Sequence, residues 1–217
     1  SEESLISLIA NELKNGKTIG WFQGRMEFGP RALGGRSILG DSRKPEMQKN
    51  LNLKVKYRES FRPFAPSVLR EDISEWFEIN TDSPYMLFVA DVNSKKTTKM
   101  NDEEKKLFGI DKLNIKRSEI PAVTHVDYSA RIQTVYQKTN PRYFKLLEKF
   151  KEKTNCPILV NTSFNIRGEP IVNTSTDAFN CFMGTELDIL AIGNCYLEKE
   201  TQNLNLKKDY SSNFELD

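Results

Sequence analysis

The sequence has few of the residues that build metal sites, histidine triads and disulfide frameworks. His125 is the only histidine among 217 residues, so a histidine-rich metal site is excluded and any histidine-based triad has one candidate base. The three cysteines, Cys156, Cys181 and Cys195, are odd in number and show no Cys-x-x-Cys spacing. Such cysteines are typical of reduced thiols in a cytosolic protein. We therefore expect a cytoplasmic protein without a bound metal.

The chain also lacks an excess of one charge and a long apolar run. Its 32 Lys and Arg residues face 30 Asp and Glu residues, a balance that argues against a nucleic-acid partner. No apolar run approaches the ~20 residues needed to cross a bilayer. The N-terminal SEESLISLIA has neither the basic region nor the cleavage site of a signal peptide. We therefore expect no membrane partner.

Hydrophobic residues make up 38% and charged residues 29% of the chain, as in a globular protein with a substantial core. Apolar periodicity predicts strands that alternate with helices, which indicates an α/β fold with a partly parallel sheet. We expect one domain over residues 1–198 and a polar C-terminal tail over 199–217. The expected strands lie at 18–22, 37–39, 64–69, 85–92, 157–160 and 189–197, with a further alternating run at 123–127. The expected helices lie at 2–14, 45–53, 71–77 and 174–183, and another follows Asn140-Pro141.

The stretch from Gly20 to Leu69 gathers cations among glycines and bulky apolar residues. Glycine lets backbone amides approach a ligand, and arginine offers a planar fork that matches phosphate or carboxylate oxygens. A phosphorylated or carboxylated small molecule is one reading, and a set of structural Arg–carboxylate pairs is the other. Arg25 and Arg36 stay open between these readings, with Glu27 or Asp41 as partners. The cations are Arg25, Arg31, Arg36, Lys54, Lys56, Arg58 and Arg62.

A second polar cluster follows the predicted strand at 157–160 and precedes a helix, the usual place for a ligand site in an α/β sheet. Here Ser163, Asn165 and Arg167 offer a hydroxyl, an amide and a guanidinium that suit phosphate oxygens, although ordinary turn chemistry also explains them. Two other regions look solvent-exposed. These are the lysine-rich segment 93–119 and Arg43, in a polar turn before Pro45.

Four motifs, taken in chain order, resemble one family over nearly all of Gly20 to Leu197. They are GRMEFGPRALGGRSIL, KVKYRESFRPFAPSV, HVDYSARIQTV and PILVNTSFNIRGEPIV. This arrangement resembles the C-terminal domain of carbamoyltransferases of the NodU/CmcH/TobZ type. The resemblance implies a YrdC-like twisted, open, mixed sheet flanked by helices. The K-x-R and S-x-N elements of YrdC-like proteins correspond to Lys56-Tyr57-Arg58, or the nearby Arg62, and to Ser163-Phe164-Asn165.

The resemblance also implies an activity. Such a domain binds carbamoyl phosphate and ATP (with Mg²⁺) as co-substrates and holds no tightly bound cofactor. It splits carbamoyl phosphate and forms carbamoyl-adenylate, with release of phosphate and pyrophosphate. An N-terminal actin-like domain then transfers the carbamoyl group to a hydroxyl acceptor that the sequence does not identify. The resemblance casts Lys56, Arg62 and Arg131 as catalytic, and the substrate-binding set as Arg31, Lys56, Arg58, Arg62, Arg131, Ser163, Asn165 and Arg167.

The H-x-D element, His125 and Asp127, either orients Arg131 or belongs to the core. Two further readings of the whole chain stay open, a nucleic-acid-binding YrdC-like module and a non-catalytic scaffold domain. A steep salt dependence of RNA affinity would favour the first, since phosphate contacts release counterions. Nucleotide binding by this chain would count against the second.

Overall fold

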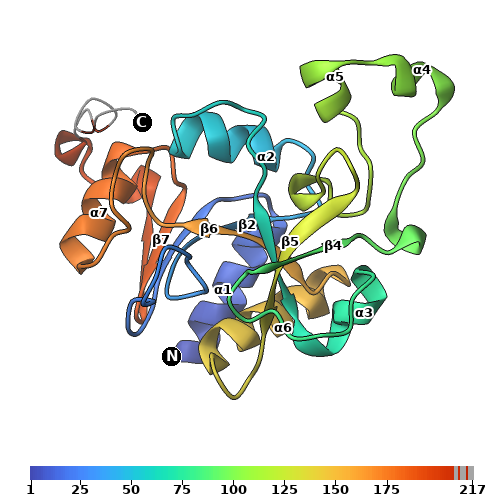
Figure 1. Ribbon diagram of the computed structural model, residues 1–217. Coiled ribbons are helices and arrows are strands. Elements are labelled where there is room, and N and C mark those ends of the chain that lie inside the picture. The colour runs from blue at the N-terminus through green and yellow to red at the C-terminus, as the bar shows by residue number, and fades with distance from the viewer. Residues whose placement is uncertain (208–209, 211–213, 215–217) are drawn as a thin grey trace.

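The computed structural model describes residues 1–207, 210 and 214, and it contains one mixed sheet of eight strands in the order β4-β5-β3-β6-β2-β1-β7-β8 (Figure 1). The pairs β1/β7 and β3/β5 are parallel, and the other neighbours are antiparallel. The expected α/β class with an open mixed sheet is therefore confirmed. The strands are β1 (Ile19–Phe22), β2 (Arg36–Asp41), β3 (Ala65–Leu69), β4 (Phe88–Asp91), β5 (Ser129–Val135), β6 (Ile158–Ser163), β7 (Ile189–Ile192) and β8 (Cys195–Glu198).

Helices flank this sheet, and the longest two, α1 and α6, lie side by side against it (Figure 1). A π-helical turn at Leu51–Val55 directly continues α2, so the helix expected from Pro45 to Leu53 begins later and ends wider than a plain α-helix. The helices are α1 (Glu2–Lys14), α2 (Met47–Asn50), α3 (Ile73–Trp76), α4 (Asp102–Lys106), α5 (Gly109–Leu113), α6 (Pro141–Thr154) and α7 (Ser175–Gly184).

Helix ends follow the local sequence closely. Ser1 caps α1, and Asn140 caps α6 with Pro141 as its first residue. At α7 the Thr174 side chain accepts from the Asp177 amide while the Asp177 carboxylate accepts from the Thr174 amide, which is a capping box. These short-range bonds explain why sequence alone placed the three helices correctly.

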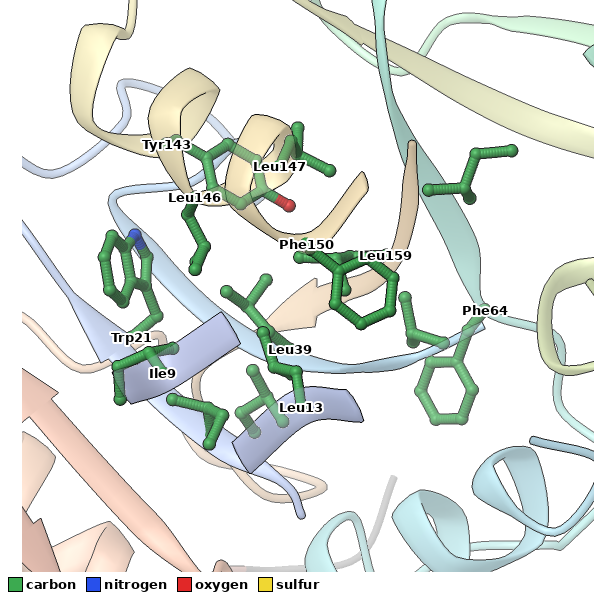
Figure 2. Packing of buried hydrophobic residues seen from close by; sticks show 14 of the residues in the cluster. Ile9, Leu13, Trp21, Leu39, Phe64, Tyr143, Leu146, Leu147, Phe150 and Leu159 are labelled. Atoms are coloured by element: carbon green, nitrogen blue, oxygen red, sulfur yellow. The ribbon is translucent and has the colours of Figure 1, made fainter. Parts of the chain in front are cut away.

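The main core fills the space between the sheet and the pair α1/α6 (Figure 2). Ile9 and Leu13 from α1 meet Leu147 and Phe150 from α6 over Leu39 of β2, and each of these side chains is fully buried. This packing holds the strands of the sheet in fixed positions. The loops at its edges carry the predicted site residues.

Three expected strands differ from the structure. Within the apolar run 85–92 only the residues of β4 form a strand, and β4 is an edge strand of the sheet. The Phe88 and Val89 side chains of β4 are 50% and 59% exposed. The run 189–197 is a hairpin, because Gly193 adopts a φ of 53° and turns β7 back into β8. The alternating run at 123–127 is not a strand either, and β5 begins only at Ser129.

The proposed boundary at residue 198 stays a prediction. Beyond it, Lys199–Thr201 and Leu204–Leu206 form 3-10 turns, and Tyr210 is buried with its hydroxyl donating to Glu169. The remaining residues of the predicted tail, 208–209, 211–213 and 215–217, lie outside the described part of the chain.

Candidate functional site

The predicted site residues gather at one end of the central strands, where β6 ends and β2, β3 and β5 begin. Strand β6 runs antiparallel to β2 and β3, and β3 runs parallel to β5, so the end of β6 lies beside the starts of the other three strands. Ser163 ends β6, Arg62 precedes β3, and Arg131 lies near the start of β5. The glycine loop 23–35 leads into β2 at this same end of the strands. Four distant motifs therefore meet in space.

Lys56 connects two of these motifs through a buried ammonium group. Lys56 is only 3% exposed. Its Nζ donates to the Ser163 carbonyl at 2.5 Å, to the Asn165 carbonyl at 2.8 Å and to Asn165 Oδ1 at 2.7 Å. Ser163 Oγ lies 3.2 Å from Nζ and donates to Asn165 Oδ1 at 2.7 Å. Burial and, after it, the charge of Arg58 lower the pKa of Lys56 from 10.5 to about 7. Lys56 thus fixes the S-x-N loop.

The local backbone explains how Lys56 reaches this loop. It follows the π-helical turn, and the next residue, Tyr57, adopts a left-handed φ of 48°. The Lys56 carbonyl accepts from the Arg167 amide at 3.2 Å, so main chain and side chain bind the same loop. A bulge and a strained residue on either side of one lysine are typical of functional positions.

Three arginines surround one carboxylate beside Lys56. Glu59 forms ion pairs with Arg62 at 3.0 Å and with Arg167 at 3.7 Å. Arg58 donates from Nε to Asn52 Oδ1 at 2.7 Å and lies 5.0 Å from the Phe64 ring centre. Burial and the charge of Arg62 lower the pKa of Arg58 to about 10. A single carboxylate among three guanidinium groups leaves a net positive site.

Arg36, the first residue of β2, has a structural function. Its guanidinium donates to the carbonyls of Gln23, Gly24 and Gly35 and lies 3.5 Å from the centre of the Phe22 ring. The expected pairing of Arg36 with Glu27 or Asp41 is therefore replaced by carbonyl and cation–π contacts. Glu27 instead accepts the amides of Leu33 and Gly35 at 2.7 Å each, which shapes the loop that presents Arg31.

A buried polar network, which the motif analysis did not detect, anchors that loop to the sheet. Asn161 on β6 donates from Nδ2 to Gln133 Oε1 at 2.8 Å, to Ser67 Oγ at 3.0 Å and to the Ala32 carbonyl at 3.2 Å. Gln133 on β5 donates from Nε2 to the Leu33 carbonyl at 2.8 Å. Asn161 lies two residues from Ser163, and Gln133 two residues from Arg131. Buried polar residues inside apolar strands were the available signal.

Arg131 is half-buried and, unlike Arg36, has no oxygen acceptor for its guanidinium among the described residues. It forms no ion pair with a described residue, its Nε is buried without a hydrogen-bond partner, and its NH2 only approaches Met86 Sδ at 4.0 Å. Burial and the nearby charge of Arg31 both lower its pKa. Arg31 itself is exposed on the glycine loop. Two neighbouring guanidinium groups without a carboxylate form a ready anion site.

His125 and Asp127 bind Ser129, at the start of β5. Asp127 Oδ1 accepts from Ser129 Oγ at 2.7 Å and from its amide at 3.0 Å, and His125 Nδ1 lies 3.3 Å from the same hydroxyl. Burial, despite the neighbouring Asp127, lowers the pKa of the half-buried His125, and Arg131 lowers it further. The H-x-D element thus braces the turn before Arg131 without a hydrogen bond to it.

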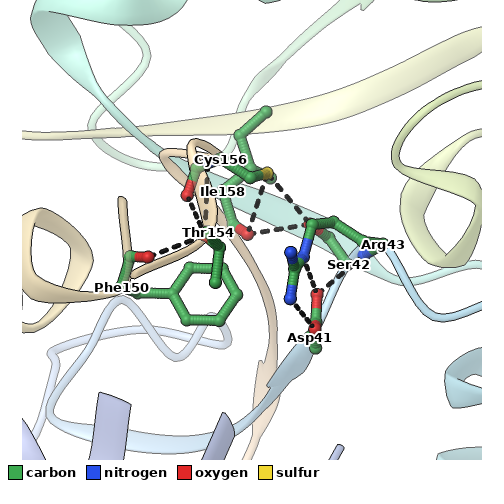
Figure 3. A network of polar contacts seen from close by, with 7 residues as sticks. All are labelled: Asp41, Ser42, Arg43, Phe150, Thr154, Cys156 and Ile158. Carbon is green, nitrogen blue, oxygen red and sulfur yellow. Dashed lines mark hydrogen bonds and ion pairs between the residues drawn. The ribbon is translucent and has the colours of Figure 1, made fainter. Parts of the chain in front are cut away.

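Arg43 is not solvated as the sequence predicted (Figure 3). Its Nε and NH2 donate to the two carboxylate oxygens of the fully buried Asp41 at 2.9 and 2.7 Å. The hydrogen bonds to Asp41 raise the pKa of Arg43. A carboxylate two residues away captures the arginine because burying Asp41 without a cation would be costly.

Two absences concern the described residues only. No group of three or more His, Cys, Asp and Glu side chains in that part of the chain is arranged to hold a metal ion. None of the helices built from those residues has the length and apolarity to cross a membrane.

Comparison with known proteins gives a consistent match to one family. The family model described as Carbamoyltransferase C-terminus matches residues 10–199. An uncharacterized protein of Synechocystis is 57% identical over all of this chain and 35% of its own length. Nodulation protein NolO of Bradyrhizobium diazoefficiens is 44% identical over 93% of this chain and 34% of its own. The 3'-hydroxymethylcephem-O-carbamoyltransferase of Streptomyces clavuligerus is 32% identical over 88% of this chain and 32% of its own. The chain spans about a third of the length of these relatives.

Proposed function

Because the chain belongs to the carbamoyltransferase C-terminus family, we propose that it binds carbamoyl phosphate and ATP and forms carbamoyl-adenylate. Water splits carbamoyl phosphate into phosphate and carbamate. A carbamate oxygen then attacks the α-phosphorus of ATP, the bond to the β-phosphate oxygen breaks, and pyrophosphate leaves. One of the family relatives is an O-carbamoyltransferase by name, which supports the carbamoyl group as the cargo.

The observation that carries this proposal is the unpaired Arg131 next to Arg31. Arg131 is half-buried and its Nε has no partner among the described residues, so a bound anion would supply the missing acceptor, and carbamoyl phosphate and ATP are both polyanions. Arg58, Arg62 and Arg167 add positive charge near the same ends of the strands, and Glu59 pairs with the last two of them. Arginines fixed in this way stabilise phosphoryl charge that develops in the transition state.

Lys56, Ser163 and Asn165 act as one unit in this proposal. The three N–H groups of Lys56 hold the S-x-N loop, so a displaced Lys56 would also displace Ser163 and Arg167. The phosphate-facing groups are the Ser163 hydroxyl and the arginines. Lys56 supplies positive charge next to these groups. Because its pKa is lowered to about 7, a phosphate that binds nearby can change the protonation state of Lys56.

ATP enters in this proposal as its Mg²⁺ complex. Mg²⁺ prefers oxygen ligands and usually keeps several waters, with substrate phosphates supplying much of its coordination. The described residues offer it no cluster of carboxylates. We therefore assign the ion to the phosphates and water and give no protein side chain to it.

The second half of the reaction needs a partner. The relatives are about three times as long as this chain, so we assign transfer to a hydroxyl acceptor to an N-terminal, actin-like domain. Leu87, Phe88 and Val89 are exposed at or beside the edge strand β4, and we assign this domain to cover them. The cytoplasm, where both substrates occur, is the proposed compartment.

The test is carbamoyl-phosphate-dependent release of pyrophosphate from ATP by the 217-residue protein, together with its thermal midpoint. Both ligands should raise the midpoint, and more together than singly, since binding to the native state alone stabilises by about 2.7 kcal/mol at a hundredfold excess over Kd. A protein that binds neither ligand at millimolar concentration contradicts the proposal. RNA binding with a steep salt dependence would instead support a nucleic-acid module.

A further inference from the structure

Tyr210 lies beyond residue 199, where the match to the family model ends, and yet it belongs to the buried core. Only 8% of the residue is exposed. Its side chain lies against Gly184, the last residue of α7, where an added Cβ would come within 2.2 Å of Tyr210 Cβ. Any residue larger than glycine at position 184 would therefore displace the tyrosine. Phe214 adds an edge-on contact, with 5.5 Å between the two ring centres.

The Tyr210 hydroxyl donates to Oε1 of Glu169, a carboxylate in the interior of the protein. Glu169 is 8% exposed, and a buried carboxylate needs hydrogen bonds because burial favours its neutral form. Burial raises the pKa of Glu169, and the bond from Tyr210 is the main influence that lowers it. The Ile166 amide, the Cys181 thiol and the charge of Lys56 lower this pKa further. Tyr210 thus does most to keep the carboxylate charged.

Glu169 closes the turn that carries Arg167. Its Oε2 accepts from the Ile166 amide at 2.8 Å, and its carbonyl accepts from Asn165 Nδ2 at 2.6 Å. Gly168 bends the chain inside this turn with a φ of 76°, a left-handed conformation that glycine adopts without strain. The Glu169 carboxylate joins the first residue of the turn to the last, so it fixes the backbone from which the Arg167 side chain extends.

The end of α7 also holds a second support of the S-x-N loop. Asn165 Oδ1 accepts from Lys56 Nζ at 2.7 Å, so the lysine fixes the loop just before the turn. The next residue, Tyr57, donates from its hydroxyl to the Gly184 carbonyl at 3.0 Å. Tyr57 and Tyr210 therefore both contact Gly184, and both supports of the loop are attached at this one helix end.

We propose that Tyr210 is a positioning residue for the S-x-N loop, because it holds the Glu169 carboxylate that fixes the turn presenting Arg167 to the phosphate of the ligand. The inference rests on the proposed function and deepens it, since it assigns support of the site to a residue beyond the family-model match. Tyr210 itself touches no ligand and acts only through Glu169. Loss of its hydroxyl therefore weakens phosphate binding without removing any group that binds phosphate.

Three variants separate this function from a general contribution to folding. Tyr210→Phe keeps the ring and removes only the hydroxyl. Gly184→Ala displaces the whole side chain without changing Tyr210 or Glu169. Tyr196→Phe is the matched control, because the Tyr196 hydroxyl also donates to a carboxylate, that of Glu198 at 2.8 Å. Both control residues lie on β8, and three strands separate β8 from β6.

Hydrogen exchange of the Ile166 amide, measured by NMR, reports the turn without any ligand. We expect this amide to exchange about tenfold faster in Tyr210→Phe and Gly184→Ala, because its acceptor is no longer held in place. Tyr196→Phe should leave it unchanged. The Val160 amide in β6 is the internal reference, since a general loss of stability accelerates exchange at both positions.

Calorimetry with carbamoyl phosphate and with ATP then tests the effect on the site. We expect Tyr210→Phe to bind both ligands about tenfold more weakly than the parent at pH 6, and the difference should shrink towards pH 8. Without the hydroxyl the pKa of Glu169 rises, so the carboxylate takes up a proton sooner as the pH falls and becomes a weaker acceptor for the Ile166 amide. Tyr196→Phe should follow the parent at each pH.

Each outcome has one meaning. Faster exchange at Ile166 alone, together with weaker and pH-dependent binding, supports the proposal. Unchanged exchange at Ile166, equal acceleration at Val160, or unchanged affinity overturns the positioning function, while the proposed function stands as long as the parent binds both ligands. A parent that binds neither ligand overturns the proposed function and the link to phosphate with it, and the exchange rates still decide whether Tyr210 holds the turn. If Tyr210→Phe does not fold, Gly184→Ala decides by the same measurements.

Discussion

Gln133 Nε2 donates to the Leu33 carbonyl at 2.8 Å, and this bond joins the glycine loop to the strand that carries Arg131. Gln133 also accepts from Asn161 and Ser67, so one buried amide links β5, β6, β3 and the loop before β2. The relative positions of Arg31, Arg131 and Ser163 follow from this network.

Gln133→Leu should therefore damage both stability and binding. Removing the amide takes the 2.8 Å donor from the Leu33 carbonyl and the shared acceptor from Asn161 Nδ2 and Ser67 Oγ, which we expect to cost about 1–3 kcal/mol of unfolding free energy. ATP affinity should fall as well, because Arg31 loses its anchor. Urea denaturation and calorimetry measure the two effects. The exposed Gln137→Leu is the matched control, and equal behaviour of the two variants would contradict the anchoring function.

Arg131→Met should separate stability from binding. The side chain has no ion pair with a described residue, so its replacement by an apolar group of similar length should leave the thermal midpoint unchanged or raise it. ATP or carbamoyl phosphate affinity should fall at least about tenfold, the loss of one charged hydrogen bond. Calorimetry and a melting curve of the same sample provide both readouts.

Arg36→Met is the comparison for that variant. It removes the donors of three loop carbonyls, and we expect a loss of about 1–3 kcal/mol of unfolding free energy. If Arg131→Met proves as destabilising as Arg36→Met, then Arg131 is structural and the anion site is misplaced.

Arg167→Lys should lower ligand binding or turnover, whereas Arg43→Lys should lower stability. Arg167 lies in the S-x-N loop beside Glu59, and loss of its fork should weaken ligand binding or turnover by roughly 1.5–3 kcal/mol. Arg43→Lys removes one of the two side-chain bonds to buried Asp41, so it should lower the unfolding free energy by about 1 kcal/mol and leave turnover unchanged. Pyrophosphate release and urea denaturation distinguish them. Full activity of folded Arg167→Lys would show that the loop is only structural.

Lys56 should make stability depend on pH. Its pKa falls from 10.5 in the unfolded chain to about 7 in the folded protein, so between these values the unfolded state binds a proton that the folded state lacks. The unfolding free energy should therefore rise with pH across this window, by up to about 1.4 kcal/mol per pH unit from this group. Below pH 7 both states are protonated and the contribution is constant.

Urea denaturation of the parent and Lys56→Met at pH 6 to 10 tests this expectation. The difference between the two proteins should grow in favour of the parent as the pH rises from 7. Exposed Lys54→Met should keep the slope of the parent. A parent and Lys56→Met with parallel pH curves would show that the buried amine stays charged throughout.

Much of the fold follows from local sequence. The helices α1, α6 and α7 begin at residues whose side chains cap them, and such bonds span only three or four positions. Strand β4 shows where local pattern fails. Its run of Leu87, Phe88 and Val89 is apolar enough for a core strand, yet it lies at a sheet edge with these side chains exposed. Strand order depends on long-range pairing, which a short window of sequence does not contain.

The sequence by itself predicted which residue types form the candidate site, namely glycines, arginines, Lys56 and the S-x-N loop, because these residue types suit phosphate oxygens. Only the tertiary structure decided what each cation contacts. Arg36 binds loop carbonyls, Arg43 binds Asp41, and Arg131 stays unpaired. The reason is physical, since a buried charge is neutralised by whichever polar groups the fold brings within about 3 Å, and most of those groups are distant in the chain.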